Sequence, residues 1–105
     1  MREQHQSTFV VPADHPSLPG HFPGSPVVPG VVVLDHVLKT TELWKQSPLS
    51  VTGLRQVKFH APLLPAEVAA VALELEGEAL AFRVTRGEQL IAQGTFVLAP
   101  AAPVR

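Results

Sequence analysis

The sequence of 105 residues contains no cysteine. It therefore has no disulfide framework, no thiol nucleophile and no thiolate metal site. Charged residues are few, at 16%, and eight Lys and Arg nearly balance nine Asp and Glu, for a formal net charge of -1. Because a dedicated nucleic-acid-binding protein has a basic excess, this balance argues against nucleic acid as a partner. With no thiols to indicate a redox compartment, a cytoplasmic location is the default expectation.

A membrane-spanning or secretory segment is also missing from the sequence. The longest stretch without Asp, Glu, Lys or Arg runs over residues 15–34, and it contains prolines at 16, 19, 23, 26 and 29. A spanning helix does not tolerate proline at that density. The first six residues are polar and lack the apolar region of a signal peptide. We therefore expect no membrane association.

The sequence does contain enough hydrophobic residues, 46%, to build a core. This fraction and the length predict one small domain over residues 1–105. A core of this size often depends on a partner chain, so an oligomer is expected.

The hydrophobic pattern predicts an α+β architecture. Residues 7–11 resemble a short strand, and the proline-rich residues 12–29 resemble an ordered loop. Apolar residues from Val31 to about Trp44 indicate one mostly buried helix, although a strand remains an alternative for residues 31–34 because their valines favour it. Alternation then predicts four strands of an antiparallel meander, at residues 49–60, 68–75, 80–84 and 90–98.

The stretch from Gly20 to Asp35 carries the chemistry. It places His21 between glycine and proline residues and Pro29-Gly30 at the start of the predicted helix. Gly30 and Val31 would present free backbone N–H groups at the positive end of that helix. Such groups stabilise a carbonyl oxygen that becomes negative during a reaction.

Asp35 follows about one and a half turns into the same helix. Its neighbours Val31, Val32 and Leu38 suggest an apolar face, on which a carboxyl stays protonated and can act as a general acid. His21 suits a general base near neutral pH. Base, acid and N–H donors together fit elimination of water from a 3-hydroxyacyl compound. The alternative for Asp35 is an exposed i,i+4 ion pair with Lys39, which would oppose the acid role unless Lys39 points away.

Two motifs in this order resemble the hot-dog-fold 3-hydroxyacyl-acyl-carrier-protein dehydratases. One is His21-Phe22-Pro23-Gly24 followed by Pro29-Gly30 and Asp35, and the other covers residues 57–65. The resemblance extends over roughly residues 7–98.

The resemblance implies an antiparallel sheet wrapped around one long central helix. His21 would be the catalytic base, Asp35 its acidic partner and Gly30 the amide that polarises the thioester carbonyl, while Phe22 would line an acyl tunnel. The substrate would be a 3-hydroxyacyl group on the phosphopantetheine of an acyl carrier protein, converted to a trans-2-enoyl thioester in fatty acid, polyketide or pigment synthesis. No cofactor or metal is implied, and a homodimer is, because one subunit's histidine faces the other's acid in this family.

The sequence departs from the family pattern in three places. Asp35 stands where most single-function members have glutamate. Aspartate at this position is typical of the dehydratase-isomerase branch. Lys39 stands where glutamine is usual. The usual amino-terminal helix and first strand are not evident, so the sheet could be one strand smaller.

Other interpretations remain open at the level of sequence. The chain could be a non-catalytic or weakly active hot-dog subunit that binds a carrier protein or pairs with another dehydratase, or a thioesterase on the same fold. Asp35 and His36 lack further ligands at usable spacing for a metal, and His60 is expected on a surface strand. Four cations could form a patch for an acidic carrier protein or be scattered, solvated charges: Arg55, Lys58, Arg83 and Arg86.

Overall fold

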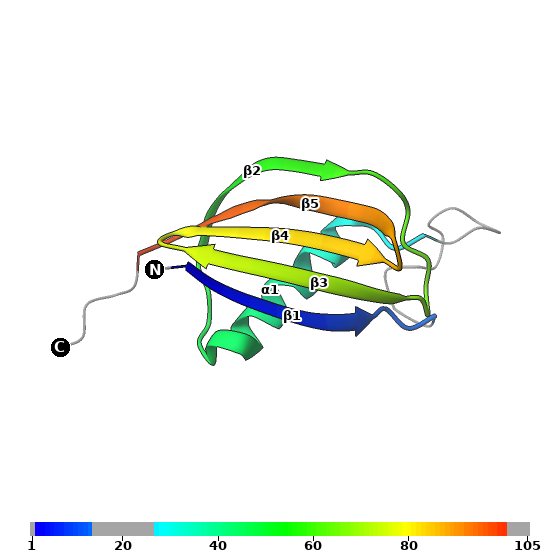
Figure 1. Ribbon diagram of the computed structural model, residues 1–105, viewed down its shortest axis with the longest axis horizontal. Coiled ribbons are helices and arrows are strands. Elements are labelled where there is room, and N and C mark those ends of the chain that lie inside the picture. The colour runs from blue at the N-terminus through cyan, green and yellow to red at the C-terminus, as the bar shows by residue number, and fades with distance from the viewer. Residues whose placement is uncertain (1, 14–26, 101–105) are drawn as a thin grey trace.

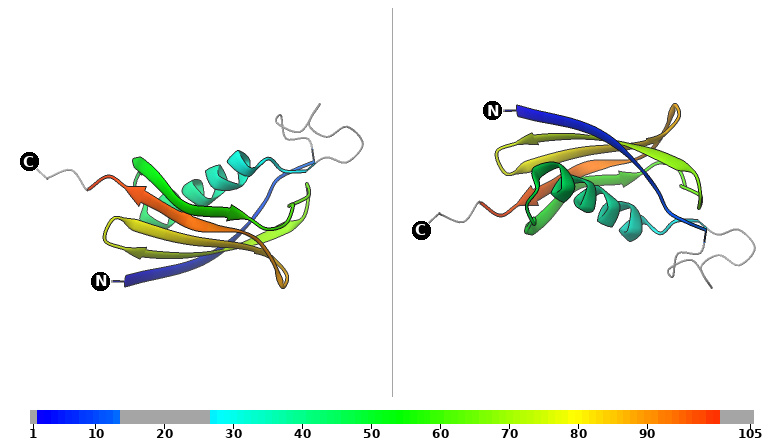
Figure 2. Two further views of the ribbon diagram at one scale, coloured as in Figure 1. Left: turned by 90° about the horizontal axis from the view of Figure 1, so that it is seen from above. Right: turned by 90° about the horizontal axis from the view of Figure 1, so that it is seen from below.

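The structure is a computed structural model that describes residues 2–13 and 27–100. These residues form, in order, β1 (Arg2–Val10), α1 (Gly30–Lys45), β2 (Val51–Phe59), β3 (Val68–Glu76), β4 (Ala79–Arg86) and β5 (Gln89–Leu98). The strands make one antiparallel sheet in the order β1-β3-β4-β5-β2. The sheet curves around α1, which lies against one of its faces (Figures 1 and 2). The predicted α+β architecture, with a sheet around a central helix, is confirmed.

Helix α1 is fixed by the side that it buries. Val32, Val33, Val37 and Thr41 are its buried residues, at the spacing of one helical face. The buried hydroxyl of Thr41 donates to the carbonyl of Val37 at 2.8 Å, so it is not left unsatisfied. This burial overcomes the weak helix propensity of the valines and excludes the strand alternative for residues 31–34.

The core lies between α1 and the inner face of the sheet. Strands β3 and β4 alternate as predicted, with every second residue fully or nearly buried. Phe82 and Phe96 contact one another across neighbouring strands, with ring centroids 5.2 Å apart. The core residues that β3, β4 and β5 contribute are Ala69, Val71, Leu73, Leu80, Phe82, Val84, Ile91, Ala92, Phe96 and Leu98.

Strand β1 starts earlier than the sequence predicts. It covers Arg2–Val10 rather than residues 7–11, and it pairs with β3 along its whole length, from Arg2 opposite Glu76 to Val10 opposite Val68. The prediction was wrong here because residues 2–8 are polar and carry no hydrophobic alternation. Backbone pairing with β3 and contacts to α1 hold this segment instead. Among the described residues that precede the proline-rich loop, the structure has strand β1 and no helix.

Those contacts with α1 are mostly polar or aromatic. Glu3 forms an ion pair with Lys45. The imidazole of His5 stacks on Trp44 with ring centroids 5.1 Å apart. Further along the strand, Phe9 stacks on His36 at 4.7 Å. Paired rings thus take the place of an aliphatic interface at this edge of the sheet.

Strand β2 contains a bulge that the sequence does not reveal. Arg55 lies opposite Thr95 and Lys58 lies opposite Gln93, so two residues of β2 face one residue of β5. Gln56 adopts a left-handed backbone conformation there, with φ of 54°. A Cβ on Gly94 would come within 2.9 Å of the Val57 backbone, so the bulge depends on a glycine in the neighbouring strand.

Most of the predicted loop at residues 12–29 lies outside the described residues. Within the described ranges, no helix is long and apolar enough to cross a membrane.

Candidate active site at the start of the central helix

The amino terminus of α1 has no cap of its own. Pro29 precedes the helix in an extended conformation, and neither a side-chain cap nor an acidic residue of the first turn neutralises the helix end. The N–H groups of Val32 and Val33 donate to the Pro29 carbonyl at 2.9 and 3.2 Å. Those of Gly30 and Val31 have no acceptor in the described part of the chain. Among the described residues, the positive helix end therefore has two N–H groups without an acceptor, as the predicted donor pair requires.

A mostly apolar groove of about 600 Å³ opens beside these donors. Phe59 from β2 lies directly over Gly30, because a Cβ on Gly30 would be only 2.7 Å from the ring carbon Cζ. The groove can therefore hold an apolar chain against a helix end that offers two N–H groups. Its walls come from the helix start, the end of β2 and the following loop, and include Val27, Val28, Gly30, Val31, Leu34, Phe59, His60, Ala61, Pro62 and Leu63.

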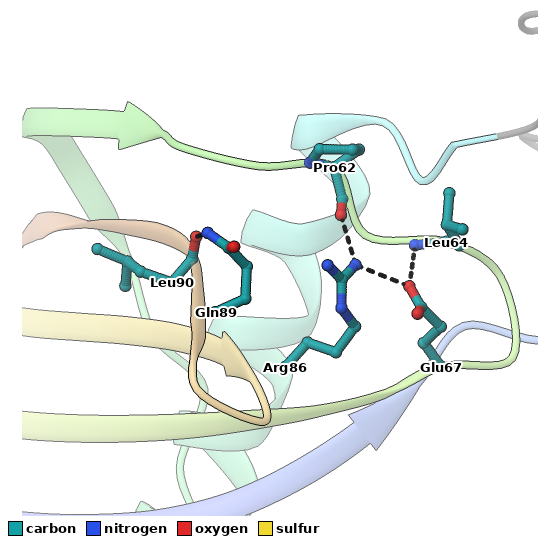
Figure 3. A network of polar contacts seen from close by, with 6 residues as sticks. All are labelled: Pro62, Leu64, Glu67, Arg86, Gln89 and Leu90. Atoms are coloured by element: carbon teal, nitrogen blue, oxygen red, sulfur yellow. Dashed lines mark hydrogen bonds and ion pairs between the residues drawn. The ribbon is translucent and has the colours of Figure 1, made fainter.

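The loop that forms one wall of the groove is held by a polar network (Figure 3). The guanidinium of Arg86 donates to the Pro62 carbonyl at 2.8 Å and to the Glu67 carboxylate at 2.9 Å. The same carboxylate accepts the Leu64 N–H at 2.8 Å. We call Arg86 and Glu67, with these contacts, the loop clamp.

The loop clamp reaches the helix start through one backbone hydrogen bond. Val28 N–H donates to the Leu63 carbonyl at 2.8 Å. Val28 and Leu63 are both buried, and Val28 is followed directly by Pro29 and Gly30. The end of β4 thereby fixes where the chain enters the helix.

Asp35 does not lie where its neighbours suggested. Its side chain is 53% exposed and forms an ion pair with Lys39 at 2.8 Å. The prediction of an apolar face was wrong because Val31, four residues earlier, is itself 74% exposed. The alternative, an exposed i,i+4 pair, is confirmed, and Lys39 does not point away. Within this chain Asp35 does not line the groove at Gly30.

Asp35 belongs to a stripe on α1 that faces away from the sheet. Val31, Asp35, Lys39 and Leu43 follow one another at four-residue spacing, and all are exposed. The two ends of the stripe are large apolar side chains, with Leu43 81% exposed. We call these four residues the open helix stripe.

His21 and Phe22, the predicted base and tunnel residue, lie outside the described residues. The structure does identify another imidazole at the groove. His60 is exposed, as expected, and it lines the groove beside Phe59 while its Nε2 lies 3.1 Å from Nε2 of Gln93. In the sequence, His60 is only the residue that follows Phe59. The contact of Phe59 with Gly30, which the sequence does not show, is what places His60 at the groove.

His36 stacks on Phe9 rather than joining Asp35. In residues 2–13 and 27–100, no three His, Asp or Glu side chains are grouped to hold a metal ion.

Known structures with the same arrangement define a class. The chain is similar to "The Dehydratase Heterocomplex ApeI:P" from Xenorhabdus doucetiae, with a TM-score of 0.81, 24% identity and coverage of 94% of both chains. It is also similar to a variant of the fluoroacetyl-CoA-specific thioesterase FlK, with a TM-score of 0.63, 22% identity and coverage of 92% of this chain and 84% of that one. These likenesses establish the hot-dog fold.

Sequence comparison identifies the family within that class. A family model described as ApeI-like, ApeI dehydratase, matches residues 1–95. The 3-hydroxyacyl-acyl-carrier-protein dehydratase FabZ of Acetivibrio thermocellus is 32% identical over 85 residues, which cover 74% of this chain and 56% of that protein. The chain thus belongs to the ApeI-like dehydratase family, and it spans about half the length of the FabZ relatives that it matches.

Proposed function

We propose that the protein is a hydro-lyase that removes water from 3-hydroxyacyl thioesters carried on phosphopantetheine, giving trans-2-enoyl thioesters in fatty acid or related polyketide and pigment synthesis. The observation that carries this proposal is the uncapped start of α1. The N–H groups of Gly30 and Val31, which have no acceptor among the described residues, lie there beside an apolar groove. The histidine motif at residues 21–24 precedes this helix end in a member of a dehydratase family.

The chemistry follows from these groups. The thioester carbonyl oxygen accepts hydrogen bonds from the Gly30 and Val31 N–H groups, which stabilise negative charge as it develops on that oxygen. His21 takes the proton from C2 of the acyl chain. A double bond forms between C2 and C3 as the bond from C3 to the hydroxyl breaks. Asp35 supplies the proton with which that hydroxyl leaves as water.

A second chain completes the site in this proposal. Asp35 does not line the groove of its own chain, and it lies in the exposed open helix stripe. Its ion pair with Lys39 joins two side chains that are each more than half exposed, so the pair is weak and a covering chain can displace Lys39. A homodimer with each groove using the other chain's Asp35 satisfies this requirement.

Hydration of a short crotonyl thioester tests the activity directly, because one site catalyses both directions. The wild-type protein is expected to bleach the enoyl-thioester absorbance, and His21→Ala is expected to remove this activity with an unchanged circular dichroism spectrum. His60→Gln tests the imidazole that the structure places at the groove. Retained turnover in His21→Ala, with loss of turnover in His60→Gln, would show that His60 rather than His21 is the base.

A second candidate function is favoured by the Asp35–Lys39 pair. In this chain the Asp35 carboxylate contacts the Lys39 ammonium at 2.8 Å and does not line the groove, which suits a non-catalytic or weakly active subunit. In that case a second hot-dog protein would supply the acid, and the similar structure from Xenorhabdus doucetiae is described as a heterocomplex. Co-purification with such a protein, together with an inactive homodimer on both free and carrier-linked thioesters, would establish this alternative.

A thioesterase remains a distinguishable outcome of the same assay. Release of free thiol from an acyl-CoA, without change in the enoyl band on a hydratable thioester, would replace elimination by hydrolysis.

A further inference from the structure

The cations of the chain divide into two groups. Apart from Arg105, all lysines and arginines lie in the described ranges. Four of them face an acid within ion-pair distance: Arg2, Lys39, Lys45 and Arg86. The other three make no ion pair with any described residue: Arg55, Lys58 and Arg83.

Strand register places these three cations on one face. Arg83 of β4 lies opposite Gln93 of β5, which lies opposite Lys58 of β2. Residues in one such row share a face of the sheet. Arg55 lies opposite Thr95 in the next row, which is the same face because Gln93 and Thr95 are two residues apart.

The bulge in β2 is what brings Arg55 and Lys58 together. Residues three apart in a regular strand point to opposite faces. The extra residue at Gln56 restores the alternation, so both cations point away from the helix. We call Arg55, Lys58 and Arg83 the outer cation cluster.

The surroundings of the outer cation cluster leave its charge uncompensated. A groove of about 620 Å³ on this face includes Lys58 and Arg83 and several glutamines: Gln4, Gln6, Gln56 and Gln93. Glu74, the acid in this lining, is held by Arg2 at 2.7 Å. A chain with a net charge of -1 thus presents a locally positive face.

This face adjoins the groove at Gly30 around the end of β2. Lys58 is followed by Phe59 and His60, which line that groove. His60 also contacts Gln93, which lines the outer groove, through the 3.1 Å Nε2–Nε2 contact. A partner bound at the outer cation cluster would therefore sit next to the entrance of the candidate active site.

We propose that the outer cation cluster docks an acidic protein surface, namely that of the carrier that brings the acyl thioester. Lys58 and Arg83 lie two strands apart, about 10 Å, which suits carboxylates spread over a protein surface better than one compact phosphate group. The proposal rests on the proposed function, because that function supplies the carrier.

Neutralisation of the outer cation cluster tests the proposal. The triple variant Arg55→Gln, Lys58→Gln and Arg83→Gln is compared with Arg2→Gln, which removes one charge from the same face but from a cation already paired with Glu74. The probes are a purified acidic acyl carrier protein, its crotonyl thioester, and the crotonyl thioester of N-acetylcysteamine.

The triple variant is expected to weaken binding of the carrier protein at least about tenfold. It should raise KM for the carrier-linked substrate by a similar factor. Binding to wild type should weaken with salt, and Arg2→Gln should change it less than about twofold. The loss should be confined to the carrier-linked substrate, which separates docking from chemistry.

Equal carrier binding by wild type and triple variant would overturn the docking proposal, even with an active enzyme. Wild type that binds the carrier through the cluster but hydrates neither thioester would instead contradict the proposed function and leave the docking surface standing. Tighter, salt-dependent binding of duplex DNA than of the carrier would also overturn the proposal, in favour of nucleic acid.

Discussion

At the residue scale, Gly30 matters because of what a side chain there would meet. A Cβ would lie 2.7 Å from Cζ of Phe59, closer than carbon atoms approach without a shift. The absence of that atom lets Phe59 cover the start of α1 and form a wall of the groove.

Gly30→Ala is therefore expected to cost about 1 kcal/mol of unfolding free energy, because the half-exposed Phe59 ring must move. It should also lower thioester hydration. Denaturant unfolding checks the first effect. Combining it with Phe59→Ala should cost less than the sum of the two single changes, and strict additivity would contradict the contact.

Lys39 provides a contrast, because its pair with Asp35 is exposed on both sides. Lys39→Ala is expected to change the unfolding free energy by less than about 0.5 kcal/mol. If Lys39 restrains the carboxylate, the same variant should raise kcat while KM changes little. A fall in kcat with unaltered stability would instead show that Lys39 contributes to the active site.

The start of α1 near Gly30, on which the two N–H groups depend, was predictable from the sequence alone. The sequence could not decide between the two environments for Asp35. That choice depends on which side of α1 meets the sheet. Consecutive valines at 31, 32 and 33 point to different sides of the helix, so they do not mark the buried one.

At the element scale, the loop clamp connects strand β4 to the groove. Arg86 and Glu67 are each about two-thirds buried, so their contacts are less screened than those of Lys39. Arg86→Gln is expected to cost about 1–2 kcal/mol of unfolding free energy. It should also lower kcat more than it raises KM, because it loosens the path through Leu63 and Val28 to Gly30.

The matched control for the loop clamp is Arg2→Gln, which breaks an exposed ion pair of similar length on the edge strand β1. It should leave kcat unaltered. Equal kinetic effects of the two variants would show that the loop clamp contributes stability alone.

The bulge in β2 is the other element with a testable cause. Gly94→Ala would place a Cβ 2.8 Å from Cγ2 of Val57 and 2.9 Å from its Cα. Because a backbone atom must move, we expect a loss of about 2 kcal/mol of unfolding free energy. Carrier binding should fall as well, since Lys58 would leave the outer face. Gly53→Ala, with 3.9 Å to its nearest neighbour Val97, is the control and should be close to neutral.

The elements themselves were largely predictable, and the exceptions have physical reasons. Alternating apolar residues marked β3, β4 and β5 because one of their faces is buried. Residues 2–8 of β1 give no such signal, since polar side chains and stacked rings fill that edge. The bulge escaped prediction because it depends on Gly94, far from Gln56 in sequence.

At the scale of the whole molecule, the described chain leaves an unpaired edge and an uncovered helix face. Strand β2 ends the sheet, and its Leu54 and Phe59 are about half exposed. The open helix stripe adds Val31 and Leu43. Apolar groups on an open edge strand favour association with another chain.

A dimer is therefore expected in sedimentation experiments at micromolar concentration. Leu54→Lys places a charge on that edge and should shift the population toward monomer, with loss of hydration activity. The control is Leu64→Lys, which changes an exposed leucine outside the sheet. It should leave the dimer intact.

The most direct test of the central claim, a site shared between two chains, is mixing of two inactive variants. His21→Ala and Asp35→Asn are each expected to lack thioester hydration as homodimers. After unfolding and refolding together, half of the dimers are mixed, and each mixed dimer has one intact site, so about a quarter of wild-type activity should return. No recovery in a mixture that contains mixed dimers, with an active wild type refolded alongside, would contradict the shared site.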